Sequence, residues 1–207
     1  MADWRRRPGE DLASALCAAE LDGERLSDKD VIAFLYLMII AGNETTTKLF
    51  ANALYWWQRN PGARAEVTAD PTLIPAWIEE TLRYDNSTQL MARTETRGVE
   101  LHGEKIRAGE KVTFWEMSAN RDERVFAEPF RFDVARDPNF HLGFGQGVHY
   151  CLGANLARLE MRVMFEELFA RYEAFEITGP AVWTRENRLL GLKHLPVRMH
   201  RARGGKS

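Results

Sequence analysis

Cysteine is scarce in this chain of 207 residues, which contains only Cys17 and Cys151. Two cysteines so far apart argue against a disulfide scaffold and fit a reducing compartment. Cys17 lies in a helical pattern with Leu12, Leu16 and Ala19, and we interpret it as a small buried packing residue. The sequence therefore indicates a cytoplasmic protein and leaves Cys151 as the cysteine to explain.

Long hydrophobic runs are also missing. The longest apolar stretch, residues 31–42, contains 12 residues, which is too short to span a bilayer. The apolar stretch behind the N-terminal arginines is short and interrupted by acidic residues, so we expect no signal peptide. No charge of one sign dominates, because 28 basic and 30 acidic side chains leave a net charge of −2. The sequence therefore predicts neither a membrane span nor nucleic-acid binding.

What the sequence does contain is a glycine-rich loop around its second cysteine. The loop reads Phe144-Gly-Gln-Gly-Val-His-Tyr-Cys-Leu-Gly153, and a leucine-rich helical pattern starts directly after Cys151. Glycines allow backbone conformations that other residues resist, so the chain can pass close under a flat ligand. Backbone N–H groups and the macrodipole at a helix N-terminus favour a thiolate. Cys151 could therefore bind a soft metal or act as a nucleophile.

A long helix is predicted over residues 28–59. Ser27 occupies its N-cap position, with Asp30 three residues later as the partner in a capping box. The Asn-Pro-Gly sequence at residues 60–62 ends the helix. Because residues 31–40 are apolar on nearly all sides, we expect this part of the helix to be buried in a core.

The middle of this helix contains a glycine and three consecutive threonines, in the segment Ala41-Gly42-Asn43-Glu44-Thr45-Thr46-Thr47. The glycine alone costs about 1 kcal/mol in a helix interior. A local rule broken inside an apolar helix points to function. A kink in which threonine hydroxyls bond to the preceding turn explains the segment equally well.

Together these segments resemble the cytochromes P450. The Phe-x-x-Gly-x-x-x-Cys-x-Gly pattern of residues 144–153 is similar to the haem-binding loop of that family, and residues 41–47 are similar to its oxygen-binding motif. The resemblance implies a haem b cofactor whose iron takes an axial thiolate from Cys151. It also implies that Glu44 and Thr45 form an acid–alcohol pair that delivers protons during oxygen activation.

The resemblance extends this site to further residues. Arg93, on a predicted strand, is expected to contact a haem propionate through its guanidinium group, and His149 is a second propionate candidate. The other residues expected to lie against the haem are Phe144, Gly145, Gly153, Ala41 and Gly42. The residues expected to contact an apolar substrate are Phe34, Met38, Ile39, Leu90 and Leu192.

A Glu-x-x-Arg motif is formed by Glu80 and Arg83, in a helix predicted over residues 75–84. This spacing places both side chains on one helix face, and such pairs on solvated surfaces contribute roughly a few tenths of a kcal/mol. In the resembled family an arginine before the haem loop completes the motif, and Arg131 is expected to supply it. The three side chains would form a buried structural network with no role in the chemical step.

The implied fold class is α+β, mainly helical with small β-sheets, and corresponds to the C-terminal half of the cytochrome P450 fold. Residues 1–207 are expected to form a single incomplete domain, because members of the family are much longer. The chain is then either a fragment or a short protein that needs partners for its exposed faces. Besides a helix over 152–172 and another over 11–20, strands are predicted at 90–94, 99–101, 104–106, 111–115, 174–178, 189–193 and 196–200.

Three functions are compatible with these residues. The first is a haem-thiolate monooxygenase that inserts one oxygen atom of O2 into an apolar small molecule, such as a sterol, terpenoid or branched lipid. Its electrons would come from a separate ferredoxin or flavoprotein, because the sequence contains no nicotinamide or flavin motif. The second is a truncated, catalytically silent protein with weak haem binding or an interaction role. The third is an enzyme with Cys151 as nucleophile and His149 as base, which is disfavoured because no third group orients them.

Overall fold

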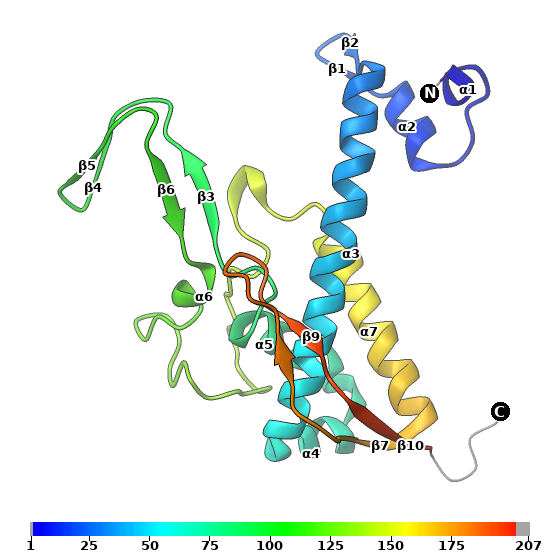
Figure 1. Ribbon diagram of the computed structural model, residues 1–207, viewed down its shortest axis with the longest axis vertical. Helices are drawn as coiled ribbons and strands as arrows, with labels where there is room; N and C mark the ends of the chain where they lie inside the picture. Colours follow the sequence, from blue (N-terminus) through cyan, green and yellow to red (C-terminus); the bar gives the residue numbers. More distant parts are fainter. Residues whose placement is uncertain (1, 202–207) are drawn as a thin grey trace. The chain divides into compact units, whose positions relative to one another are not determined.

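The computed structural model describes residues 2–201. The chain divides into two compact units, Met1–Glu44 and Thr45–Ser207, and the boundary falls inside the long helix α3 (Asp28–Arg59) (Figure 1). The bounds of this helix are those predicted from the sequence.

The first unit begins with two short helices, α1 (Ala2–Arg6) and α2 (Leu12–Ala18), and a hairpin of β1 (Glu20–Leu21) and β2 (Glu24–Arg25). The helix expected over residues 11–20 therefore ends earlier than predicted, at Ala18, and Glu20 already belongs to β1. The physical reason is the turn, where Asp22 and Gly23 have φ angles of 51° and 83° and close a two-residue hairpin.

The predicted capping box at the start of α3 is confirmed. The backbone N–H of Asp30 donates to Ser27 Oγ at 3.2 Å, and the backbone N–H of Ser27 donates to the Asp30 carboxylate at 3.2 Å. Two N–H groups that the helix itself cannot satisfy are bonded in this way.

The N-terminal half of α3 is more exposed than predicted. Val31 is fully buried, but the side chains that follow on the other faces are not: Tyr36 is 65% exposed and Ile39 is 69% exposed. The expected burial of residues 31–40 is therefore wrong for this chain. A helix that is apolar on all sides needs neighbours on all sides, and the described residues do not supply them.

The second unit is built around the C-terminal part of α3. The helices α5 (Ile74–Tyr84) and α7 (Ala154–Arg171) pack with it in one apolar core, and α4 (Pro61–Ala69) and the short 3₁₀ helix η1 (Pro71–Leu73) connect α3 to α5 (Figure 1). Helix α4 was not predicted.

Aromatic side chains fill the centre of this core. The ring of Trp57 on α3 lies 4.9 Å from that of Trp77 on α5 in an edge-to-face arrangement, and 4.7 Å from that of Phe169 on α7. Trp77 and Phe165 are completely buried. Because each such pair adds about 0.5–1.5 kcal/mol beyond the apolar area it buries, these contacts fix the three helices against one another.

The strands form small antiparallel pairs. In the second unit β3 (Met91–Thr94) pairs with β6 (Lys111–Phe114), and β4 (Val99–Leu101) pairs with β5 (Glu104–Ile106). The last two pairs join β7 (Tyr172–Ile177) to β10 (Val197–Arg201) and β8 (Val182–Trp183) to β9 (Leu192–His194). The predicted α+β class, mainly helical with small sheets, is confirmed.

Most predicted strands are found within two residues of their expected bounds, but β9 begins three residues later than expected. Residues 189 and 190 pair instead with the chain that follows α5. Leu189 forms an isolated bridge with Thr88, and the backbone N–H of Leu190 donates to the Ser87 carbonyl at 2.8 Å.

Between α6 (Glu116–Ala119) and the short 3₁₀ helix η2 (Gly147–His149), the chain is irregular. Buried Phe126, Phe132 and Val134 attach this segment to the rest of the unit. Within residues 2–201, no helix has both the length and the hydropathy required to cross a membrane.

Candidate functional site

The loop around Cys151 closes on itself and ends at the N-terminus of α7. The backbone N–H of Cys151 donates to the Phe144 carbonyl at 2.9 Å, and the N–H of Tyr150 donates to the Gly147 carbonyl at 3.0 Å. The Cys151 carbonyl accepts from the N–H of Ala154, the first residue of α7, at 3.2 Å. The Cys151 thiol is free and exposed.

Glycines serve two purposes in this loop. Gly145 and Gly147 have φ angles of +68° and +70°, which other residues adopt only at a cost. Gly143 is needed for space, because a Cβ there would lie 3.0 Å from the Leu82 carbonyl oxygen of α5. Gly145 and Gly147 thus allow the loop to turn, and Gly143 allows the backbone to lie directly against α5.

Two buried amides fix the start of this loop. Asn86, just after α5, donates its Nδ2 to the Gly143 carbonyl at 2.9 Å. Asn120 accepts the backbone N–H of Leu142 on its Oδ1 at 2.7 Å. Because both amides are almost inaccessible to solvent, these hydrogen bonds hold the loop on a rigid base.

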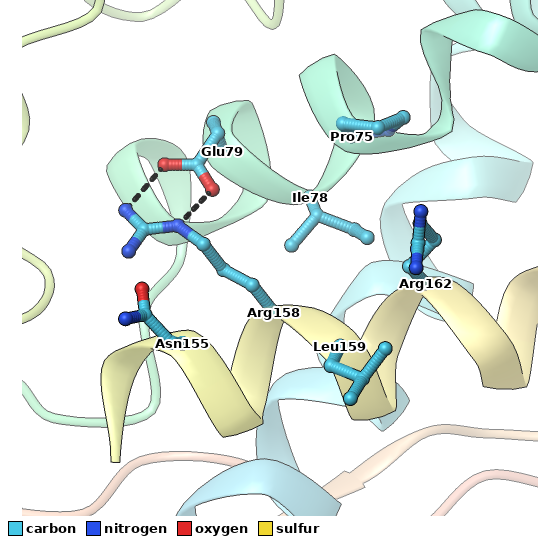
Figure 2. Close-up of a pocket in the computed structure, with 7 residues that line it drawn as sticks. All are labelled: Pro75, Ile78, Glu79, Asn155, Arg158, Leu159 and Arg162. Carbon is cyan, nitrogen blue, oxygen red and sulfur yellow. Dashed lines mark hydrogen bonds and ion pairs between the residues drawn. The ribbon is translucent and has the colours of Figure 1, made fainter.

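A second cluster, not predicted from the sequence, joins the loop to α5 and α7. Arg158 of α7 binds the Glu79 carboxylate of α5 with two hydrogen bonds, Nε to Oε1 at 2.7 Å and Nη2 to Oε2 at 2.8 Å (Figure 2). His141 contacts the same carboxylate through Nε2 at 3.0 Å. Burial opposes ionisation of Glu79, but the hydrogen bonds from Arg158 and His141 outweigh it and lower its pKa to about 2.

A cleft of about 240 Å³ lies beside this cluster. Figure 2 shows that α5 and α7 both contribute side chains to it, among them the Glu79–Arg158 pair. The full lining consists of Pro75, Ile78, Glu79, Asn155, Arg158, Leu159 and Arg162.

The Glu80–Arg83 pair is fully buried, as predicted for a structural motif. Arg83 donates Nε and Nη2 to the two Glu80 carboxylate oxygens at 2.8 and 2.7 Å. Its remaining N–H groups reach backbone carbonyls, those of Asn120 and Pro129 at 2.9 Å and that of Arg131 at 3.0 Å. All five donors of the guanidinium group therefore have an acceptor.

The third arginine of this network is Arg136, and the expectation that the Arg131 side chain completes it is wrong. The Arg136 Nε lies 3.4 Å from the Glu80 carboxylate, and its side chain is 9% exposed. The Arg131 side chain is 61% exposed and pairs with Glu128 at 3.1 Å, so that residue contributes only its backbone carbonyl. The path of the irregular segment decides which arginine turns inward.

Arg93 lies on β3 and is half-buried. Its guanidinium group lies over the Phe114 ring at 5.3 Å, and within residues 2–201 no ion pair joins it to a carboxylate. Burial raises the pKa of Glu116 to about 7, although the positive charge of Arg93 opposes that shift. His149, in η2, is exposed.

The site residues predicted on α3 lie in one continuous helix, which is not interrupted at Gly42 or at the three threonines that end with Thr47. Phe34, Met38 and Thr45 are half-buried, whereas Ile39 and the stretch from Ala41 through Gly42 to Glu44 are exposed. Elsewhere, the backbone bonds between residues 87–89 and 188–190 bring the segments of Leu90 and Leu192 together, and both side chains are half-buried.

The chemistry of Cys151 restricts the kind of metal it can hold. Within the described part of the chain, no group of three or more His, Cys, Asp or Glu side chains is arranged to hold a metal ion. A single soft donor suits a metal whose other ligands belong to a macrocycle. Val148 and Leu152, three residues before and one residue after Cys151, are exposed apolar side chains. The residues present therefore fit a haem with one axial thiolate.

Comparison with known proteins gives a consistent result. The family model described as cytochrome P450 matches residues 2–200. A Mycobacterium bovis relative with the provisional name cytochrome P450 123 is 49% identical over 199 residues, which are 95% of this chain and 50% of the relative. The methyl-branched lipid omega-hydroxylase of Mycobacterium bovis is 44% identical over 197 residues, covering 94% of this chain and 46% of that protein.

Solved structures agree with these relatives. The crystal structure of CYP109E1 from Bacillus megaterium in complex with testosterone superposes with a TM-score of 0.89 at 37% identity, over 95% of this chain and 55% of that one. The chain spans about half the length of the curated relatives that it matches.

Proposed function

The chain belongs to the cytochrome P450 family, and on that premise we propose that it supplies the thiolate ligand of a haem-thiolate monooxygenase. This enzyme would insert one oxygen atom of O2 into an apolar small molecule and reduce the other to water. The observation that carries the proposal is the free, exposed Cys151 thiol in a loop bent by left-handed glycines and fixed against α5.

A haem b bound at this site would supply oxygen activation, and a thiolate ligand would favour O–O cleavage. The residues of this chain would hold the cofactor. Cys151 would ligate the iron, and Arg93, with His149, would bind the propionates through charge-assisted hydrogen bonds. Phe144, Gly145 and Gly153, and on α3 Ala41 and Gly42, would be the cofactor's further contacts.

Glu44 and Thr45 would handle protons. The two are neighbours on α3, and a carboxylate and a hydroxyl can hold a chain of waters through which protons enter an apolar site. Positioned groups of this kind typically accelerate proton transfer by about 10²–10⁴-fold. The acid and the alcohol would thus direct oxygen reduction toward product.

An apolar substrate is supported by the side chains proposed to contact it, Phe34, Met38, Ile39, Leu90 and Leu192. It is also supported by relatives and neighbours, whose names include a methyl-branched lipid hydroxylase and a complex with testosterone. We propose a ferredoxin or flavoprotein as electron donor, and a cytoplasmic location.

Haem titration of the 207-residue chain tests the cofactor assignment. We expect the reduced carbon monoxide complex to give a thiolate-type band, and Cys151→Ser to abolish it, because a hydroxyl is a much weaker donor to a soft metal. Cys17→Ser is the matched control, because Cys17 is buried in the first unit and should leave the band unchanged. An unchanged thiolate-type band in Cys151→Ser would refute the ligand assignment.

A second candidate is a catalytically silent chain with weak haem binding or an interaction role. It is favoured by the exposed apolar side chains of α3, such as Tyr36 and Ile39. Apolar surface that no described residue covers is typical of a site that needs a further partner. Haem affinity separates the candidates: a silent chain would lose haem readily on gel filtration, whereas the site of a monooxygenase would retain it.

A further inference from the structure

We infer that Arg158, oriented by Glu79, is a positioning residue that fixes the two flanks of the Cys151 loop. The inference rests on the proposed function, because it assigns Arg158 to the support of the thiolate ligand. It concerns a pair distinct from the Glu80–Arg83 network, which faces the irregular segment at residues 120–139.

The contacts of Arg158 carry the argument. Two of its N–H groups bind Glu79, and a third, on Nη1, donates to the Tyr150 hydroxyl at 3.1 Å. The guanidinium carbon also lies 4.6 Å from the centre of the Phe144 ring. Tyr150 directly precedes Cys151, and the Phe144 carbonyl accepts the Cys151 N–H at 2.9 Å. One side chain thus contacts both the residue that precedes Cys151 and the residue whose carbonyl accepts the Cys151 N–H.

Glu79 makes this arrangement rigid. Its carboxylate aligns the planar fork of Arg158 and is in turn held by His141. The Gly143 N–H donates to His141 Nδ1 at 3.1 Å, so Nε2 carries the proton and donates to Glu79. The cluster therefore runs from the start of the loop through α5 and α7 to the residue before the cysteine.

Arginine is chemically specific in this place. A lysine would keep the charge, but it could not at the same time bind Glu79 with two parallel bonds, reach the Tyr150 hydroxyl and lie over the Phe144 ring. The conservative variant Arg158→Lys therefore removes the geometry and keeps the charge. Tyr150→Phe removes a single contact and leaves the Glu79 pair intact.

Amide hydrogen exchange of the 207-residue chain tests the inference without haem. We expect exchange of the Cys151 amide to quicken by about fivefold in Tyr150→Phe, which is the effect of losing one net hydrogen bond. The acceleration should be larger in Arg158→Lys, because that variant also loses the paired bonds to Glu79 and the contact with the Phe144 ring. Exchange of the Met161 amide, in the buried middle of α7, should not change. Arg162→Lys is the control, because Arg162 lines the same cleft but pairs with Glu166 at 3.8 Å.

The haem-bound chain supplies the second measurement. If Arg158 positions the ligand, Arg158→Lys should lower the thiolate-type share of the reduced carbon monoxide band, and Arg162→Lys should not. Equal acceleration at Cys151 and Met161 would mean general destabilisation and would overturn the inference, as would unchanged exchange or an unchanged thiolate share. If the unaltered chain gives no thiolate band, the proposed function fails, and the exchange data alone decide the role of Arg158.

Discussion

Removal of the Glu80 carboxylate should be among the most damaging single changes in this protein. Glu80 is completely buried and accepts hydrogen bonds from two Arg83 nitrogens at 2.7 and 2.8 Å, from the Asp133 backbone N–H at 2.9 Å and from Asn139 Nδ2 at 3.1 Å. In Glu80→Ala the Arg83 guanidinium stays buried with its charge uncompensated. Breaking a buried ion pair in this way costs about 3–5 kcal/mol.

Such a loss is large compared with the whole stability of a protein, which is typically about 5–15 kcal/mol. For a chain of this length, each kcal/mol lowers Tm by roughly 2–4 °C, so the variant should melt about 6–20 °C below the unaltered chain. Urea titration gives the free energy of unfolding directly, provided that the slope against denaturant is unchanged.

Two arginine variants provide the matched comparison. Arg136→Ala removes a side chain that lies 3.4 Å from Glu80, whereas Arg131→Ala removes one that is 61% exposed and should cost less than about 0.5 kcal/mol. A loss below about 1 kcal/mol in Glu80→Ala would show that the pair behaves as a surface ion pair. A larger effect of Arg131→Ala than of Arg136→Ala would refute the assignment of the network.

Three further predictions concern other parts of the chain. In the reconstituted haem enzyme with its electron donor, Thr45→Ala should raise the peroxide released per electron pair and lower the yield of product, while haem uptake stays intact. An unchanged ratio of product formed to electrons consumed would show that Thr45 is not on the proton path. Gly191→Ala should cost about 1–3 kcal/mol in chemical denaturation, because its Cβ would lie 2.5 Å from Lys48 Cγ, whereas Gly62→Ala has open space and should not destabilise. Burial raises the pKa of Asp85 from 3.8 to about 6, so between these pH values the native state binds more protons than the unfolded chain. The free energy of unfolding should therefore fall as the pH rises from about 4 to about 6. Asp85→Asn should flatten that fall in urea titrations across the same range, and an identical pH profile would contradict it.

The sequence alone determined the elements whose signals are local. The capping box at Ser27 and the Asn-Pro-Gly stop set both ends of α3, because caps and breakers act through their nearest neighbours. The turn at His102 and Gly103 defined the β4–β5 hairpin for the same reason. The loop around Cys151 was also recognisable, since its spacing and glycines are local features.

Only the tertiary structure decided how distant residues combine. The sequence pointed to Arg131, but the path of an irregular segment turns Arg136, five residues later, toward Glu80. The Glu79–Arg158 pair joins residues 79 positions apart, for which no periodic pattern exists. The exposure of residues 31–40 likewise depends on which surfaces are available to cover them. Local signals fix helices and turns because they act within a few residues, whereas burial and pairing depend on the packing of the whole chain.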